Sequence, residues 1–528
     1  MAMPERLDAP RNIVILGGGS AGWMTAAALT QALKGTDTTI QLVESEEIGA
    51  IGVGEATFPS IRLFNRLLGI DEFDFVQATS GSFKLGIEFV DWRVVGERYF
   101  HTFGDFGPVK GNTALWGQFA ALRREAKANG NTARLTALGQ LSDYCLPTVM
   151  ARDGRFVQPS TDTQSLFSRY NYAYHFDASL YAGFLRKRAE RQGCARIEGK
   201  VSEVRLRPDD GYIDALILSD GRELTGDLFI DCSGFIALLL NKTLNVPFVD
   251  YAPWLPVDGA WAMPTAQDSP VLAPYTRATA LEAGWTWRIP LQHRTGNGYV
   301  FSSRFIDSDT ARTRLMAAVG NDKVLAEPRL IQFRTGHRER FWEKNCVAIG
   351  LSGGFLEPLE STSIYLIQAG IARLIGLLPG HRKNPLLARE YNRVQVNEFE
   401  RIRDFIILHY CLSERNDSEF WRHMRAMPLP DSLAYKIEIW RETGQIVMMT
   451  DEGFDEASWL AIYTGLGLWP RREDPLVMQT SDFAQLAQRR QLIAEGVTHL
   501  PSHEAFINRF CRASNGLRET GSELFAVR

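Results

Sequence analysis

Apolar residues near the start of the chain follow two different patterns. Residues 13–16 are all apolar, which is typical of a strand buried on both faces of a parallel sheet. Residues 26–33 continue with small and apolar side chains over a helical length, and the run TIQLVES, which ends near Glu44, predicts a second strand. These patterns predict a strand–helix–strand unit at the start of the fold.

Further along the chain, segments in which apolar and polar residues alternate are followed by segments in which apolar residues recur with the spacing of a helix. Residues 201–231 carry turn signals at 209–211 and 220–221, which predicts a β-meander that ends in an apolar strand at 228–231. Another strand is expected in the run NCVAIG. From about Tyr365 onward, IYLIQAGIARLIGLL, RIRDFIILHYCL and residues 431–443 predict helices. We therefore predict an α/β (α+β) fold in which residues 371–528 are mainly helical.

The run SFKLGIEF, residues 82–89, alternates strictly between two kinds of residue. Apolar side chains occupy every second position, and the positions between them are Ser82, Lys84, Gly86 and Glu88. This alternation predicts a half-buried strand. Its polar face is either a solvated surface, the usual place for a lysine, or the lining of a site. The alternation alone leaves both readings open.

The amino-acid composition indicates a globular protein and gives no sign of nucleic acid or a membrane as its partner. The 528 residues are 45% hydrophobic and 23% charged, as in globular proteins long enough for two or more domains. With 58 basic and 62 acidic residues, the formal net charge of -4 gives no reason to expect nucleic acid or an anionic membrane as partner. No apolar run reaches the length of a membrane span and no signal peptide is recognisable, so we expect a cytoplasmic protein.

The cysteines argue against a metal site. All six are scattered, and none forms a CxxC pair of the kind that binds zinc. We expect reduced, mostly buried thiols and no metal.

A glycine motif lies between the first predicted strand and the first predicted helix. Gly17, Gly19 and Gly22 form GxGxxG, in which the glycines let the backbone approach a pyrophosphate at a helix N-terminus. Glu44, at the end of the second strand, is placed to accept a hydrogen bond from a ribose hydroxyl. No second motif of this kind follows a strand. The sequence therefore predicts one dinucleotide site and no built-in NAD(P)H site.

Two further stretches combine apolar residues with reactive or aromatic side chains. GGFLEPLESTSIYLI, residues 353–367, holds Glu357, Glu360 and three hydroxyl residues in an apolar setting. WTWRIP places Trp285 and Trp287 on the same face of a strand. Taken alone, such a tryptophan pair is either part of the core or the wall of an aromatic site.

Several of these strings together resemble the flavin-dependent halogenases, and especially the tryptophan-halogenase group. The strings that match, in the order of that family, are GxGxxG, GVGEATFPS, GSFKLGIEFVDW, AYHFDA, DLFIDCSG, GWTWRIP, GNGYVFSS and FLEPLESTSIY. The resemblance runs from about Asn12 to about Tyr410 and continues more weakly to Pro470.

The resemblance implies an FAD-binding fold of the GR2 or hydroxylase type. Residues 1–370 then form the FAD-binding module with an inserted substrate-side β-sheet, and residues 371–528 form a helical subdomain over the substrate site. The implied cosubstrates are FADH2, O2 and chloride or bromide. The residues expected at the cofactor are Gly17, Gly19, Ala21, Gly22, Glu44, Gly54, Glu55, Val201, Leu351 and Ile364.

The resemblance also implies roles for the reactive residues. Hypohalous acid made at the flavin passes through a tunnel to Lys84, and Glu360 orients the oxidant or accepts the proton of the substrate. Backbone amides of Thr362 and Ser363 bind the halide. Ser363 stands where the tryptophan halogenases have glycine, so a positive φ there would strain it and would alter halide preference, with bromide favoured over chloride. The residues expected to separate flavin from substrate are Trp285, Trp287 and Pro290.

The expected substrate wall consists of His101, Phe103 and Trp459. The segment that binds the amino-acid end of tryptophan in the family looks shortened here to GQIVMMTDEGFDEA. We therefore expect an electron-rich aromatic such as indole or an indole derivative rather than free tryptophan. A separate NAD(P)H-dependent flavin reductase and a homodimer are expected from the resemblance. The alternatives are a flavin-dependent aromatic monooxygenase and a non-catalytic flavin-binding sensor.

Overall fold

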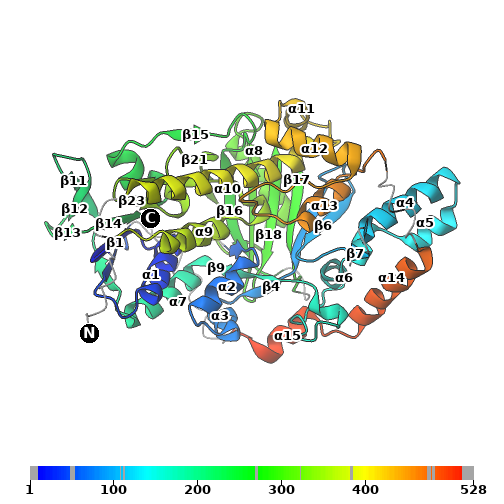
Figure 1. Cartoon of the computed structure of the whole chain (residues 1–528), viewed down its shortest axis with the longest axis horizontal. Coiled ribbons are helices and arrows are strands. Elements are labelled where there is room, and N and C mark those ends of the chain that lie inside the picture. Colours follow the sequence, from blue (N-terminus) through cyan, green and yellow to red (C-terminus); the bar gives the residue numbers. More distant parts are fainter. Residues whose placement is uncertain are drawn as a thin grey trace, which may run out of the picture.

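The first sheet of the molecule is built from strands that lie far apart in the sequence (Figure 1). A computed structural model describes residues 10–513 except for 48–53, 108, 111–112, 268–271, 321–322, 381–383, 473–476 and 478–481. The six strands, in sheet order, are β10 (Ala195–Glu198), β2 (Thr39–Glu44), β1 (Asn12–Leu16), β14 (Leu228–Asp231), β23 (Cys346–Ala348) and β22 (Trp342–Glu343). All neighbours are parallel except the antiparallel edge pair β23–β22. The two apolar strands predicted downstream thus return to the sheet of β1, β14 beside β1 and β23 beside β14, as expected for an α/β flavoprotein fold.

A second, larger sheet forms the other half of the molecule. Its seven strands, in sheet order, are β20 (Arg329–Gln332), β16 (Gly259–Thr265), β19 (Thr295–Phe301), β18 (Gly284–Pro290), β17 (Thr276–Leu281), β5 (Gly86–Val90) and β6 (Arg98–Thr102). The tryptophan motif WTWRIP lies in β18, whose neighbours β17 and β19 are both antiparallel to it. The predicted β-meander is a separate sheet of β11 (Val201–Leu206), β12 (Ile213–Leu218) and β13 (Glu223–Thr225).

A small sheet of three short strands links the two halves. Strand β9 (Ala173–Asp177) pairs antiparallel with β3 (Gly54–Ala56) on one side and with β4 (Ser82–Lys84) on the other. The side chain of His175 on β9 lies between the Ser82 hydroxyl, 3.0 Å from Nδ1, and the Thr276 hydroxyl, 2.9 Å from Nε2. Since Ser82 donates to the Pro290 carbonyl at 2.7 Å, it accepts from the ring. Burial lowers the pKa of His175 well below its ordinary value, which keeps the ring neutral as this chain of hydrogen bonds requires.

Helices cover the sheets and dominate the C-terminal third of the chain. Helix α1 (Ser20–Ala32) follows β1 and packs against α7 (Ala178–Arg191) and α9 (Ser363–Gly376). The long helix α10 (Pro385–Cys411) runs beside α9 in Figure 1 and contacts it. The remaining helices in the second half are α8 (Ser308–Val319), α11 (Glu419–Ala426), α12 (Asp431–Thr443), α13 (Glu456–Gly465), α14 (Phe483–Thr498) and α15 (His503–Phe510). The earlier helices are α2 (Ser60–Leu67), α3 (Glu72–Ala78), α4 (Leu115–Ala128), α5 (Thr132–Leu138) and α6 (Leu146–Arg152).

The strand predicted to be half-buried is buried on both faces, so the prediction for residues 82–89 is wrong in this respect. The chain breaks at Leu85 into β4 and β5, and the side chains of Ser82, Lys84 and Glu88 all have hydrogen-bond partners from other elements. Glu88, only 2% exposed, accepts from Arg277 at 2.6 Å and from Arg98 at 3.2 Å. Alternation reports which residues share a face of a strand, but it does not report whether another layer covers that face.

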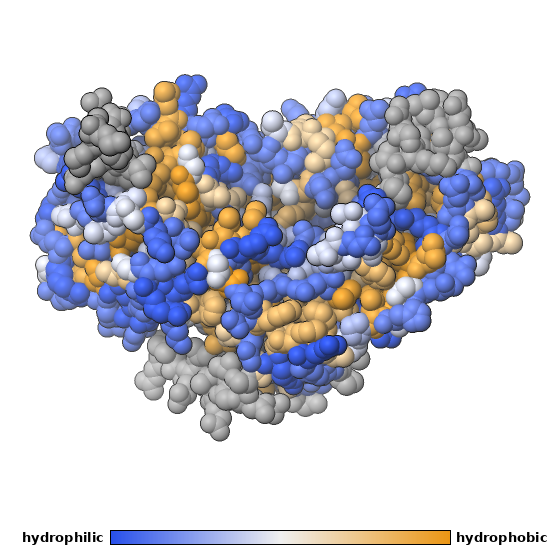
Figure 2. Space-filling model, turned by 60° about the horizontal axis from the view of Figure 1, so that its bottom comes forward, coloured by the Kyte–Doolittle hydropathy of each residue, from blue (hydrophilic) through white to orange (hydrophobic). Residues whose placement is uncertain are grey.

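The last described helix, α15, packs directly on the strand that carries Lys84. Nε2 of His503 accepts from the Phe83 amide at 3.0 Å, and its Nδ1 donates to the Leu272 carbonyl at 2.9 Å. The ring of Phe506 lies 5.4 Å from that of Phe83 and 5.0 Å from that of Phe156. Figure 2, which brings the α15 side of the molecule forward, shows apolar patches separated by hydrophilic residues on this face. Phe510, the last residue of α15, is 44% exposed.

We predict that Phe506→Ala destabilises the protein far more than Phe510→Ala. Phe506 is 5% exposed inside a cluster of aromatic rings, so truncation leaves a cavity and costs about 3–5 kcal/mol. Phe510 lies on the same helix but is partly in water, so its truncation costs about 1 kcal/mol or less. Thermal unfolding followed by circular dichroism measures both variants. Equal shifts in the unfolding midpoint would contradict the assigned packing of α15.

Candidate active site

The GxGxxG loop packs so closely that side chains are excluded at two of its glycines. Gly17 has φ +114°, and a Cβ there would lie 2.3 Å from the Cys232 carbonyl oxygen. A Cβ at Gly22 would lie 1.8 Å from the Gly17 carbonyl oxygen. These contacts press the start of α1 against β1 and the end of β14. The glycines therefore serve the close strand–helix packing of a dinucleotide-binding unit.

The third glycine of the motif faces open space instead. A Cβ at Gly19, the N-cap of α1, would meet nothing within 4 Å among the described residues, and no side chain caps the helix. Uncapped amides at a helix start attract phosphate. A Cβ at Gly350 would come within 2.9 Å of Ala21, so the turn that carries Leu351 closes over the same end of α1. The uncapped start of α1 and the turn at Gly350, together called the GxGxxG cradle below, fit the pyrophosphate of FAD.

The other residues expected at the cofactor lie on several different elements. Glu44 ends β2, but its carboxylate also accepts from Arg196 at 2.5 Å and from the Trp23 indole at 3.3 Å. Gly54 and Glu55 lie on β3, and burial raises the pKa of Glu55 to about 7. Val201 begins β11, and Ile364 is buried in α9. No motif indicated that Arg196 would pair with Glu44.

Lys84 is a fully buried lysine with neutral hydrogen-bond partners. Its Nζ donates to the Thr57 carbonyl at 3.0 Å and to the Ser361 hydroxyl at 2.8 Å, and the side chain is 0% exposed. Burial lowers the pKa of the amine to about 7, although the charge of nearby Glu360 opposes this effect. Near neutral pH, a substantial fraction of this amine is therefore unprotonated and nucleophilic.

Glu360 lies next to Ser361 in the chain and is held by two histidines. Its Oε2 is 2.8 Å from Nδ1 of His101, and its Oε1 is 2.8 Å from Nε2 of His409. Burial on its own raises the pKa of a carboxyl group, but the charges and hydrogen bonds of both histidines hold that of Glu360 at about 2. A buried carboxylate that stays ionised beside Lys84 can orient a polar oxidant and stabilise developing positive charge.

The segment between Glu360 and α9 turns sharply, but not at the residue that we expected. Ser361 takes the left-handed conformation with φ +61°, whereas Ser363 is the first residue of α9. The predicted strain at Ser363 is therefore wrong, and with it goes the reason to expect a bromide preference. Thr362 is the N-cap of α9, and its buried hydroxyl has no partner among the described residues. Thr362 and Ser363 thus lie at a helix start that no side chain caps.

The tryptophan pair of β18 is fixed from behind by the second carboxylate of the same segment. The rings of Trp285 and Trp287 lie 6.2 Å apart, and the Trp285 indole donates to Glu357 at 3.1 Å. The Tyr410 hydroxyl donates to the same carboxylate oxygen. Burial raises the pKa of Glu357 to about 7, while these two donors act in the opposite direction. Pro290, at the end of β18, accepts from Ser82 and so ties this strand to β4.

Aromatic rings gather on the other side of Lys84. Nζ of Lys84 lies 5.4 Å from the Phe103 ring centroid, and Phe103 packs edge-on against Phe58 at 5.7 Å. The ring of Phe454 lies 5.5 Å from Phe58 and 6.1 Å from His101. The buried Nε2 of His101 has no partner among the described residues. These four residues, Phe58, His101, Phe103 and Phe454, are called the aromatic cluster below.

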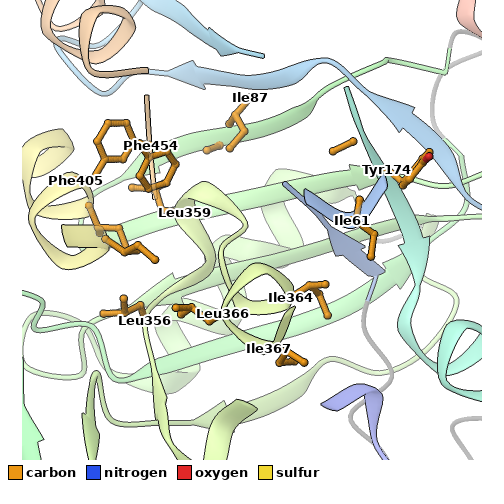
Figure 3. Close-up of a cluster of buried hydrophobic side chains, with 14 of the residues drawn as sticks. Ile61, Ile87, Tyr174, Leu356, Leu359, Ile364, Leu366, Ile367, Phe405 and Phe454 are labelled. Atoms are coloured by element: carbon orange, nitrogen blue, oxygen red, sulfur yellow. The ribbon is translucent and has the colours of Figure 1, made fainter. Parts of the chain in front are cut away.

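Trp459, which we predicted in the substrate wall, lies outside the aromatic cluster. It is fully buried one layer further back, 5.0 Å from Phe405 and beneath the Lys436 ammonium at 4.0 Å. Phe454 stacks on the near side of Phe405 at 3.9 Å, as Figure 3 shows. The preceding segment has no regular secondary structure, so spacing alone did not reveal which aromatic residue turns inward.

Two classes of site are absent from the part of the chain that the structure describes. Within residues 10–513 and outside the gaps given above, no group of three or more histidine, cysteine, aspartate or glutamate side chains is arranged to hold a metal ion. In the same residues, no helix has the length and apolar character needed to cross a membrane.

Comparison with known proteins places this arrangement in one family. The sequence model of the family described as tryptophan halogenase matches residues 12–482. A tryptophan 6-halogenase of Streptomyces toxytricini is 37% identical over 478 residues, which cover 88% of this chain and 91% of that protein. A tryptophan 7-halogenase of Lentzea aerocolonigenes is 36% identical over 444 residues, which cover 81% of each chain.

Solved structures agree with the sequence relatives. A flavin-dependent halogenase from Brevundimonas sp. BAL3 superimposes with a TM-score of 0.89 at 46% identity, covering 94% of this chain and 99% of the other. A flavin-dependent halogenase from Xanthomonas campestris gives a TM-score of 0.89 at 43% identity, covering 96% and 99%. The α/β FAD-binding fold predicted from the sequence is thereby confirmed, and the chain belongs to the tryptophan halogenase family, as a flavin-dependent halogenase.

Proposed function

We propose that the protein halogenates an electron-rich aromatic such as indole, with Lys84 as the group that carries the halogen to the ring. Reduced FAD bound at the GxGxxG cradle would reduce O2 by two electrons to the peroxide level, at which it can oxidise a halide to hypohalous acid and water. The observation that supports the proposal is the combination of a fully buried Lys84, whose hydrogen-bond partners are neutral, with Glu360, whose two oxygens face two histidines.

The proposed step at Lys84 is a nucleophilic transfer. The neutral amine attacks the halogen of hypohalous acid, which forms an N–halogen bond and releases water. The halogen then passes to the aromatic ring, and the amine recovers a proton as the ring loses one. Burial supports this role because it lowers the proton affinity of Lys84 and excludes competing water.

Glu360 is proposed to stabilise the cationic ring and to accept its proton. A carboxylate that two histidines keep ionised is available for both tasks at neutral pH. The aromatic cluster lies around His101, which joins it to Glu360.

The halide is proposed to bind at the start of α9, where the Thr362 and Ser363 amides meet the flavin side of the segment. The rings of Trp285 and Trp287 are proposed to separate flavin from substrate, so that the oxidant reaches the ring only through a tunnel to Lys84.

The other cofactor residues are proposed as expected from the sequence. With no second GxGxxG motif, a separate flavin reductase supplies FADH2. A homodimer is also proposed, on family resemblance alone.

Membership in the halogenase family favours this activity over the two alternatives from the sequence, a monooxygenase and a flavin-binding sensor. The named relatives halogenate tryptophan. Our preference for indole rests on the short segment 445–455, which places Phe454 against His101 and anchors itself by Glu452 on Lys436 and by Asp451 on Asn397 at 3.0 Å. Asp451 and Glu452 thus each have a partner within the protein, which supports a substrate that lacks an amino-acid end.

We predict that Lys84→Met and Lys84→Arg both lower halogenation about 100-fold or more. Methionine removes the amine, and arginine keeps a positive charge but cannot lose its proton. Mass spectrometry of indole incubated with enzyme, FAD, a flavin reductase and bromide measures the product. Oxygen consumption in the same samples is the control and should continue. Retained halogenation in Lys84→Arg would show that Lys84 acts as a cation and not as a carrier.

We predict that indole is halogenated in preference to tryptophan when both compete at equal concentration. The reason is the missing segment for the amino-acid end of tryptophan. Mass spectrometry of the mixture with chloride and with bromide decides this point. A product pool dominated by halotryptophan would overturn the substrate assignment, and an unchanged pool of both would leave the chain without the proposed activity.

We predict that Phe454→Ala raises the KM for indole by about 2- to 10-fold, since one aromatic ring contact is worth about 0.5–1.5 kcal/mol. Trp459→Phe is the matched control, because Trp459 packs behind Phe405 and should leave the KM nearly unchanged. Steady-state kinetics with indole measures both variants. A larger rise in the KM for indole in Trp459→Phe than in Phe454→Ala would instead support Trp459 as the residue of the substrate wall.

A further inference from the structure

His409 is a fully buried histidine that no sequence motif indicated. It lies near the end of α10 and is 0% exposed. The ring is packed between Phe89 at 4.9 Å, Phe405 at 5.4 Å and Trp92 at 6.0 Å. Each of its two ring nitrogens lies within hydrogen-bond distance of an oxygen atom. Whether these oxygens donate or accept determines how many protons the ring carries.

Both partners of His409 are hydrogen-bond acceptors. Nδ1 lies 2.9 Å from the Phe405 carbonyl oxygen, which can only accept. Nε2 lies 2.8 Å from Oε1 of Glu360, which also can only accept when it is ionised. A neutral imidazole carries one proton and cannot donate at both nitrogens. Either His409 is an imidazolium cation or Glu360 carries the second proton.

The surroundings of Glu360 favour an ionised carboxylate, and therefore the imidazolium form of His409. Its other oxygen, Oε2, faces Nδ1 of His101 at 2.8 Å, so the carboxyl group has a nitrogen partner on each side. N–H donors to both oxygens stabilise the ionised carboxylate. The low pKa of Glu360, about 2, agrees with this placement of the proton.

A second buried histidine in the same protein shows the opposite arrangement. His503 accepts from the Phe83 amide at Nε2 and donates to the Leu272 carbonyl at Nδ1. One donor and one acceptor require a single proton, so this ring is neutral. Burial lowers the pKa of His503 to about 4. The two rings are equally buried, and their charge is set by what their nitrogens face.

The charge of His409 matters because of Lys84. A bare carboxylate close to an amine holds the amine in its protonated form, in which it cannot take up a halogen. Nζ of Lys84 itself bonds to Thr57 and Ser361, which are neutral. The titratable groups that face this region are Glu360, His101 and Tyr99, with His175 on β9 and His409 on α10. Of the three histidines, only His409 has at both ring nitrogens, among the described residues, partners that cannot donate when Glu360 is ionised.

We propose that His409 is an imidazolium cation in the resting protein, that it neutralises the charge of Glu360, and that it thereby leaves Lys84 free to act as a neutral amine. His409 is then a positioning residue, which acts through Glu360. The proposal rests on the carrier role proposed above for Lys84. Its tests need no turnover, so their failure and the failure of the halogenation assay are distinguishable.

The first test reads the protonation of His409 directly. Nitrogen NMR of the full-length protein with 15N-labelled histidine distinguishes a ring with two N–H groups from a neutral ring, and His409→Gln assigns the signal. We expect the doubly protonated form of His409 at neutral pH, with His503 neutral in the same spectra. In Glu360→Gln, His409 should become neutral. A neutral His409 in the unsubstituted protein would overturn the proposal.

The second test reads the proton affinity of Lys84. Competitive labelling with acetic anhydride over a range of pH, followed by peptide mass spectrometry, gives the midpoint at which each lysine becomes reactive. His409→Gln keeps a donor to Glu360 but loses the charge, so the Lys84 midpoint should rise by about one pH unit or more. His503→Gln replaces an equally buried but neutral ring next to Phe83 and should leave the midpoint in place. A midpoint that is the same in His409→Gln and in the unsubstituted protein would refute the charge role.

Discussion

The removal of Lys84 from water is the constraint on which the rest of the structure depends. Burying an ammonium group away from water costs free energy, and here burial lowers the pKa of Lys84 so that the amine loses its charge, since among the described residues no carboxylate bonds to it directly. Keeping the amine out of water requires other elements to pack around it. Strand β9 pairs along β4, the turn after Glu360 closes over Nζ, and α15 seals the neighbouring residue Phe83 through His503.

The two sheets contribute different halves of the site, and one short segment joins them. The parallel sheet delivers the chain from β23 to the glycine turn beside α1, where the cofactor cradle lies. Within a few residues the same segment supplies Glu357 to the tryptophan strand of the larger sheet and Glu360 to the histidines. The buried polar residues between 353 and 367, which look misplaced in the sequence, are therefore the points at which the two halves are fastened.

The sequence predicted features that depend on local pattern or on a contiguous motif. The strand–helix–strand unit, the meander, the strand at 228–231 and helix α12 were all visible in this way. Burial of Lys84 was not, because it depends on β9 and α15, which come from distant parts of the chain. The conformation at Ser361 and the inward turn of Phe454 were also hidden, since neither lies in a periodic element. His409 looked like one more residue in an apolar helix, and only its two acceptors give it a distinct chemistry.

Helix α10 holds both carboxylates of that segment with consecutive residues, Tyr410 on Glu357 and His409 on Glu360. Consecutive helix positions point about 100° apart, and here the two directions meet acids three residues apart. A one-residue insertion or deletion upstream in the helix would rotate both side chains away at once. Evolution can therefore alter this helix by substitution but scarcely by length. The loop at 445–455 is also attached at two consecutive residues, Asp451 and Glu452, but it has no helical register that a change of length would rotate. Changes in substrate range are therefore expected to accumulate there while α10 keeps its length.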